Sequence, residues 1–453
     1  MHWLTLPDPR KNIVPAFQDV AGARAWLAQQ PQAHPSQTLA ALAMQVEAID
    51  ASAVAPALAI ELLGLLRTAA VPLQDAIEPR YTRKALPLPE DDFRAFELAA
   101  RFWLRLGVAY LRRHDELAPA ERGLALNRAA CALRLAAYCH FLAAYECPQA
   151  INRLLFGTLA QASRDGLLEQ ALPDRDFPHL GDSTVAGHLA WAFLLRLVDP
   201  YRLTGAQLTV ANRAISRWRE LAPFRAAPDD DPAARELDLA PLYGGALPAE
   251  VPRWLGIRSV DRKLRRRLES LRQGEAPEAL KLGRELSGDA CIRLLEELRH
   301  SLGAHEHEPS TEIGEIALAF GGEDAYALLR GEYLNPAANL GSGGALAHQR
   351  MALFGFDRLS QMPTAVKRIQ VATESWTLLD GMVIRPAAGP DSVRRISPCL
   401  VAASHHGRPQ LGVLFGLQVG TDNVLSGGLH WYDGAIEAGW LKRPELREQA
   451  APR

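Results

Sequence analysis

The sequence has few cysteines, few aromatic residues and almost no net charge, and each shortage excludes a class of protein. Its five cysteines in 453 residues are odd in number and irregularly spaced, so they do not form a disulfide framework. The formal net charge of −2 argues against a general nucleic-acid-binding protein, because such proteins carry a basic domain. The N-terminus shows no basic segment followed by an apolar one, as a secretory signal would. We therefore expect a cytoplasmic protein that binds no nucleic acid.

Long apolar runs are also missing. No stretch of about 18 uncharged apolar residues occurs, which predicts that the chain has no transmembrane segment. The nearest candidate, residues 51–66, contains Glu61 and Pro56. We interpret that stretch as a buried helix hairpin.

The common catalytic motifs are absent as well. The sequence contains no HExxH, CxxC, GxSxG or GxxxxGK[ST] pattern. His305 and His307 could bind a metal ion as a pair, but the spacing supplies no third ligand, and a hydrolase built on them is the weakest hypothesis. The glycine-rich residues 341–348 fit a linker better than a phosphate-binding loop. We expect a protein that is not an enzyme and has no metal site and no cofactor.

The first half of the chain has the pattern of an all-α domain, which we assign to residues 1–228. Its apolar share comes mostly from alanine and leucine, which favour helices. Residues 92–114 place Phe93, Phe96 and Trp103 on one face of an amphipathic helix. Thr184 and Thr204 precede helical segments as N-caps.

The amino-acid composition changes near residue 228, which predicts a second, small α+β domain over residues 229–335. The segment 226–238 is rich in proline and aspartate, as linkers are. An arginine-rich helix follows at residues 260–274, and we interpret its charges as a solvated face. Residues 312–334 indicate a strand, a glycine turn and a short helix.

The last part of the chain, residues 336–453, predicts a linker and a small antiparallel β-barrel. Here apolar residues recur at every second position, as in β-strands, and glycine or proline separates the strand candidates. There are five such candidates: residues 368–380, 382–386, 399–407, 409–420 and 424–434.

Four stretches, taken in order, resemble a known family. They are residues 122–163, residues 189–218 with the pentad Asp199-Pro200-Tyr201-Arg202-Leu203, residues 316–332, and the pair 374–380 and 409–417. The sequence resembles the FimW-type proteins, which are PilZ-containing effectors of cyclic di-GMP connected with pili and surface attachment. The resemblance implies a helical domain followed by a PilZ-like barrel, and a receptor that signals through protein contacts.

The resemblance also implies where a ligand would bind. PilZ domains hold cyclic di-GMP through an R-x-x-x-R segment before the barrel and a [D/N]-x-S-x-x-G motif on an early strand. In this sequence Asp380 matches the acidic position, whereas Met382 stands at the serine position and Arg385 at the glycine position, and no R-x-x-x-R precedes the barrel. The nucleotide-binding candidates are Arg350, Arg358, Lys367, Arg368, Asp380 and Arg385.

Two functions follow from the resemblance. The first is a cyclic-di-GMP effector that acts on a protein partner of the pilus or attachment machinery. The alternative is a degenerate PilZ-like scaffold or adaptor that binds no nucleotide.

Overall fold

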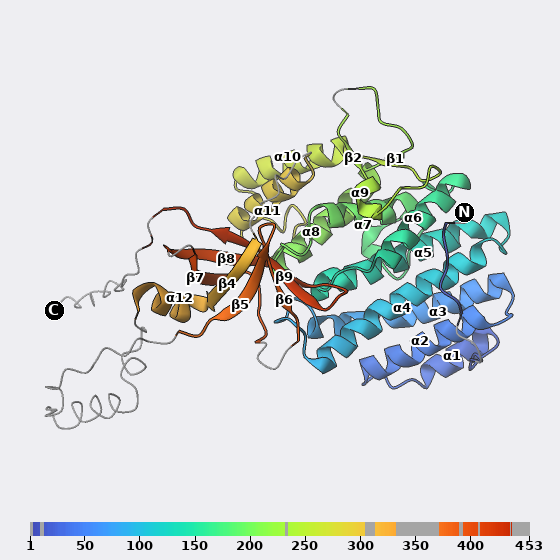
Figure 1. Cartoon of the computed structure of the whole chain (residues 1–453). Helices are drawn as coiled ribbons and strands as arrows, with labels where there is room; N and C mark the ends of the chain where they lie inside the picture. The colour runs from blue at the N-terminus through green and yellow to red at the C-terminus, as the bar shows by residue number, and fades with distance from the viewer. Residues whose placement is uncertain are drawn as a thin grey trace, which may run out of the picture. The chain divides into compact units, whose positions relative to one another are not determined.

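The chain forms two compact units (Figure 1). The computed structural model describes residues 3–9, 13–231, 234–303, 313–331, 371–388, 393–405, 408–434 and 436. The first unit consists of Met1–Glu308, Ala387–Ile396 and Leu417–Leu425. The second unit consists of Pro309–Pro386, Ser397–Gly416 and Ser426–Arg453.

The first unit is mainly helical, which confirms the predicted N-terminal all-α fold. Up to residue 221 its α-helices are α1 (Val20–Ala28), α2 (Pro35–Ala51), α3 (Pro56–Ile77), α4 (Glu90–His114), α5 (Pro119–Ala143), α6 (Gln149–Arg164), α7 (Val185–Leu197) and α8 (Gly205–Trp218). Short 3₁₀ turns follow α3, α6 and α8 at Glu78–Arg80 (η1), Pro178–Leu180 (η2) and Arg219–Leu221 (η3).

Local sequence signals fix many of the helix boundaries. Prolines occupy the first turn of α2, α3 and α5, where their missing N–H costs no helical hydrogen bond. The predicted N-caps are confirmed: the Thr184 hydroxyl accepts from the Gly187 N–H, and Thr204 forms a capping box with Gln207. Such caps satisfy N–H groups that have no partner inside the helix.

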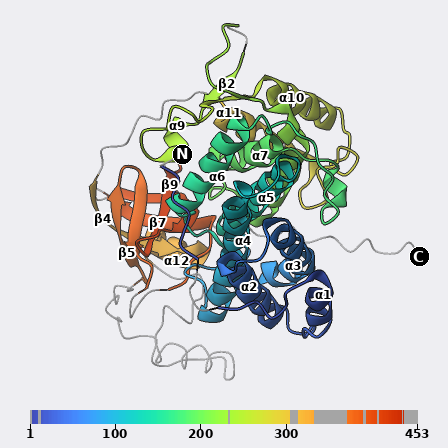
Figure 2. The same ribbon diagram turned by 90° about the vertical axis from the view of Figure 1, so that its right-hand side faces the viewer.

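The core of the first unit forms around α4 and α5, which lie side by side in both views (Figure 2). The aromatic face predicted for residues 92–114 is largely buried, with Phe96 and Trp103 almost fully covered. Gly107 of α4 lies so close to Leu133 of α5 that a Cβ there would come within 2.8 Å of the leucine Cγ. The glycine therefore permits the close approach of the two helices.

One segment of the described chain, Pro56–Arg80, is long and apolar enough to cross a membrane by length and composition. It comprises α3 and η1, and α3 packs against α1, α2 and α4. Helix packing thus accounts for its apolar character. The predicted helix hairpin of residues 51–66 is the junction at which α2 ends and α3 begins.

A small sheet and three further helices follow in the described part of the first unit. Its strands are β1 (Phe224–Arg225), β2 (Glu236–Asp238) and β3 (Trp254–Gly256) in the order β1-β3-β2, and the helices are α9 (Ala240–Tyr243), α10 (Arg258–Arg272) and α11 (Gly288–Ser301). The boundary predicted at residues 228 and 229 falls between β1 and β2. Both strands pair with β3, so the acidic segment between them is a connection within one sheet.

The later strands close into an antiparallel barrel, as predicted, and most of the barrel residues belong to the second unit, while Leu417–Leu425 is part of the first. Its strands are β4 (Ile313–Phe320), β5 (Glu374–Leu379), β6 (Met382–Pro386), β7 (Cys399–His405), β8 (Arg408–Val419) and β9 (Val424–Trp431), in the order β4-β5-β6-β9-β8-β7. The five strand candidates correspond to β5 to β9. The sixth strand, β4, comes from the segment that the sequence had assigned to the middle domain, and α12 (Gly321–Arg330) packs against β4 and β7.

Candidate functional site

Four of the predicted nucleotide-binding residues, Arg350, Arg358, Lys367 and Arg368, lie outside the described residues. His305 and His307, the candidate metal pair, lie outside them as well. The other two predicted residues, Asp380 and Arg385, lie on the β5–β6 hairpin.

Asp380 forms the turn of that hairpin together with Gly381. Leu379 pairs with Met382 across it, and the turn residues have φ angles of 52° for Asp380 and 74° for Gly381. Two residues with positive φ define the tight turn that suits the twist of antiparallel strands, and Asp-Gly is one of its preferred sequences. The backbone geometry thus explains Asp380 without a ligand.

Arg385 is engaged inside the barrel. It is 8% exposed, and its guanidinium lies 4.9 Å from the centre of the Trp376 ring. Glu374 accepts a hydrogen bond from the Trp376 indole at 3.2 Å and lies 3.7 Å from the Arg385 Nε. The three side chains form one buried polar cluster, so Arg385 stabilises the barrel wall.

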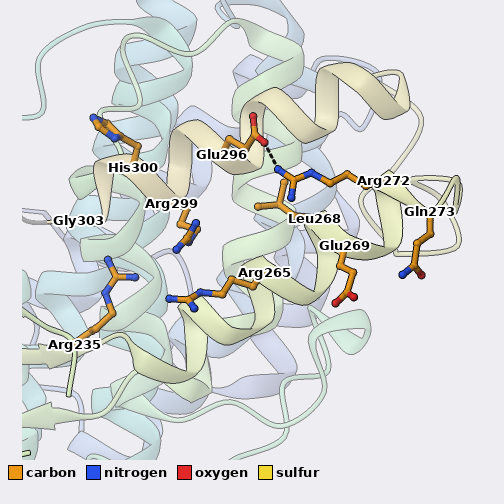
Figure 3. Close-up of a pocket in the computed structure, with 10 residues that line it drawn as sticks. All are labelled: Arg235, Arg265, Leu268, Glu269, Arg272, Gln273, Glu296, Arg299, His300 and Gly303. Carbon is orange, nitrogen blue, oxygen red and sulfur yellow. Dashed lines mark hydrogen bonds and ion pairs between the residues drawn. The ribbon is translucent and has the colours of Figure 1, made fainter. Parts of the chain in front are cut away.

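An arginine groove, defined by Arg235, Arg265, Arg272 and Arg299, lies between α10 and α11 (Figure 3). Its hollow measures about 1100 Å³. Arg265 and Arg272 extend from α10, Arg299 from α11, and Arg235 from the segment before β2. All four belong to the first unit.

The buried carboxylate of Asp261 draws three of these guanidinium groups together. It lies 2.6 Å from Arg235, 2.7 Å from Arg265 and 2.9 Å from Arg299. Burial alone would raise the pKa of this carboxyl, but the hydrogen bonds and charges of the arginines outweigh it and lower the pKa below its usual value. Three positive groups around one negative group leave an excess of positive charge at this end of the groove.

The other end of the groove is held by a second ion pair. Arg272 on α10 reaches Glu296 on α11 at 2.5 Å, and both side chains are largely exposed (Figure 3). The guanidinium fork can contact phosphate oxygens through two N–H groups at once. The arrangement is therefore suited to bind an anion with more than one phosphate.

Sequence reasoning missed this groove because it requires two helices and a loop to meet. Arg265, Leu268 and Arg272 are spaced by three and four residues, which places them on one face of α10. That spacing was visible within the arginine run, whose charges we had interpreted as a solvated face. The contribution of Arg235 and Arg299 depends on the packing of α10 against α11.

One buried cluster has the side chains of a metal site. Ligand atoms of Cys131, Asp174 and His188 lie within 4.8 Å of one another. Arg67 already donates to Asp174 and lies 3.5 Å from the Cys131 sulfur, while Arg128 reaches Asp174 at 2.6 Å. These guanidinium groups supply the positive charge that a metal would bring, so the cluster is better suited to an internal ion pair than to a cation.

Comparison with known proteins assigns the helical region to a family. Residues 21–229 match the family model described as the N-terminal domain of the cyclic-di-GMP receptor FimW. This region of the chain is similar to the FimW N-terminal domain. Neither the curated proteins nor the solved structures contain a match. The FimW domain covers α1 to α8 and β1, so the arginine groove and the barrel lie beyond the matched residues.

Proposed function

We propose that this protein is a non-enzymatic receptor for cyclic di-GMP, located in the cytoplasm. The observation that carries the proposal is the FimW N-terminal domain at residues 21–229, because that family model is named for a cyclic-di-GMP receptor. The free cysteines among the described residues are mostly buried, which is consistent with a reducing compartment.

The arginine groove is the first proposed contact region for the phosphates. Arg265 and Arg272 are both 59% exposed at their side chains, so a ligand can reach them from solvent. The second proposed region is the set predicted from the sequence: Arg350, Arg358, Lys367, Arg368, Asp380 and Arg385.

Calorimetric titration of the full chain with cyclic di-GMP tests the proposal. We expect the wild type to bind, and the double variant Arg265→Gln/Arg272→Gln to bind at least tenfold more weakly, because each lost charge-assisted hydrogen bond costs roughly 1.5–3 kcal/mol. The matched control is Arg262→Gln/Arg266→Gln, which removes the same charge from exposed positions of the same helix outside the groove.

The barrel-side residues are tested in the same assay. Arg350→Gln/Arg358→Gln removes two predicted phosphate contacts. Asp380→Asn removes one carboxylate charge and keeps a residue that suits the turn. A loss of affinity in these variants, with the groove variant unchanged, would place the ligand at the barrel.

We further propose that the receptor acts through a protein partner of the pilus or attachment machinery. Affinity capture from cells with and without cyclic di-GMP is expected to recover a partner whose yield depends on the nucleotide. If the folded wild type shows no binding at high micromolar cyclic di-GMP, the receptor proposal fails. A partner captured equally with and without nucleotide would then favour the scaffold alternative.

A further inference from the structure

Helix α10 carries a dense positive charge. Seven of its fifteen residues are basic and two are acidic, a net charge of +5 in a chain whose formal net charge is −2. The apolar side chains Leu264, Leu268 and Leu271 are buried. In both views α10 lies on the outside of the first unit (Figures 1 and 2). The opposite side of the helix is therefore left to its charged residues.

Four basic side chains on that opposite side form one surface, which we call the cationic stripe. Its members are Arg262, Lys263, Arg266 and Arg267. The first three are exposed and the fourth is half-buried. Residues four apart lie one above the other on a helix, so Arg262 neighbours Arg266 and Lys263 neighbours Arg267. The stripe thus presents two adjacent rows of positive charge to solvent.

The charge of the stripe is not neutralised by the carboxylates around it. Within the described part of the chain, no ion pair involves any of its four members. The buried Asp261 is bound by three arginines outside the stripe, and Glu296 of α11 is bound by Arg272. Glu269 is the other acidic residue of α10 and can offset one charge. Three positive charges of the stripe therefore remain.

The surroundings of the stripe favour a lipid bilayer over a macromolecular partner. Specific protein interfaces have an apolar or aromatic centre, and no exposed large hydrophobic side chain lies in the described part of residues 224–303. The stripe also has no aromatic ring on which a nucleic-acid base could stack. Anionic lipid headgroups, in contrast, attract a cluster of four or more lysines and arginines by charge.

We propose that the cationic stripe of α10 docks the protein on an anionic lipid bilayer. The helix keeps its place in the first unit, because its apolar side is already buried, and the stripe contacts headgroup phosphates from above the membrane surface. The attraction is screened over about 10 Å at 0.1 M salt, so the attachment is peripheral and depends on salt. The proposal goes beyond the receptor function and does not rest on cyclic-di-GMP binding.

Vesicle flotation of the full chain tests this docking. One set of vesicles contains phosphatidylcholine alone, and the other contains phosphatidylcholine with one third phosphatidylglycerol. We expect the protein to float with the anionic vesicles and not with the neutral ones. Raising the salt from about 0.1 M to about 1 M should release it, because the screening length falls to roughly 3 Å.

A double variant tests the stripe itself. Arg262→Gln/Arg266→Gln should weaken vesicle binding roughly 25-fold, because each basic residue near an anionic surface contributes about fivefold. Its unfolding transition should match that of the wild type, since both side chains are exposed and neither forms an ion pair within the described residues. The matched control, Arg24→Gln/Arg153→Gln, removes the same charge from exposed positions of α1 and α6 and should bind vesicles nearly as the wild type does.

The proposal is overturned if the folded wild type does not float with anionic vesicles, or floats equally with neutral ones. It is also overturned if the double variant binds as tightly as its control. Tighter binding to a DNA duplex or to polyglutamate than to anionic vesicles at the same salt would overturn it too, and would assign the stripe to a nucleic acid or an acidic protein. Vesicle binding is measured without nucleotide, so this proposal and the receptor proposal fail separately.

Discussion

Arg67 and Asp174 form a bidentate ion pair inside the first unit. The two guanidinium nitrogens lie 2.9 Å and 2.5 Å from the two carboxylate oxygens, and both side chains are 2% exposed. Arg67 comes from α3, whereas Asp174 comes from the segment between α6 and α7, so the pair joins parts of the helical region that are distant in sequence. This pair holds the segment after α6 against the helical core.

Breaking this pair should strongly destabilise the protein. Asp174→Asn takes one of two carboxylates from the buried Arg67 guanidinium, which keeps Asp176, and also removes a carboxylate from Arg128, so we expect the free energy of unfolding to fall by about 3 kcal/mol. Urea denaturation followed by circular dichroism measures the loss. The control is Arg94→Gln, which breaks the exposed Arg94–Glu90 pair and should cost less than about 1 kcal/mol. Equal losses in the two variants would contradict the role given to burial.

His188 should make the stability of the protein depend on pH. It is fully buried, and burial together with the surrounding arginine charges lowers its pKa well below the usual value. An unfolded histidine binds a proton below about pH 6.5, whereas the folded one does not, so stability is greatest above that pH and falls as the pH decreases. His140, whose pKa is lowered to about 4 by burial, acts in the same direction.

Unfolding free energies measured between about pH 7 and pH 5 test this dependence. His188→Gln should reduce the slope by at most about 1.4 kcal/mol per pH unit, the value for one proton. His179→Gln, at an exposed position, is the control and should leave the slope as it is in the wild type. An unchanged slope in His188→Gln would show that this histidine does not contribute.

Two helical glycines should respond to alanine in opposite ways. At Gly107 a Cβ would come within 2.8 Å and 2.9 Å of Leu133 side-chain atoms, so Gly107→Ala should overpack the α4–α5 contact and cost about 1–3 kcal/mol, less the gain in helix propensity. At Gly64 of α3 nothing lies within 4 Å of the added Cβ. Gly64→Ala should therefore stabilise the protein by roughly 0.5–1 kcal/mol. Thermal unfolding of both variants measures the difference, and a gain at Gly107 would contradict the close packing.

The β5–β6 hairpin should depend on glycine at position 381 and tolerate a change at position 380. Gly381→Val places a branched residue at a φ of 74° and should cost at least roughly 1–2 kcal/mol. Asp380→Asn should change stability by no more than about 0.5 kcal/mol, because asparagine also accepts positive φ. Hydrogen exchange of the hairpin amides reports both effects. Gly322→Val serves as the control, because nothing lies within 4 Å of its added Cβ and its φ is not in the left-handed region.

The local elements could be predicted from the sequence because their causes are local. Proline at first turns, Thr184 and Thr204 as N-caps, and apolar spacing of three and four fix where helices begin and which face is buried. Alternation of apolar residues likewise identified the five strands from β5 to β9.

The other features of the fold and of the candidate site depend on tertiary packing. Packing brings together residues that are far apart in the sequence and that no local pattern relates. The sequence predicted a strand at β4. That this strand belongs to the barrel depends on its pairing with β5 and β7, which lie more than fifty residues further along the chain. The arginine groove exists only because α10 packs against α11 and Asp261 gathers three guanidinium groups. The sequence by itself determined the helices, most strands and the family resemblance. Only the folded chain determined which charges meet, since electrostatic contact depends on distance in space and not on spacing along the chain.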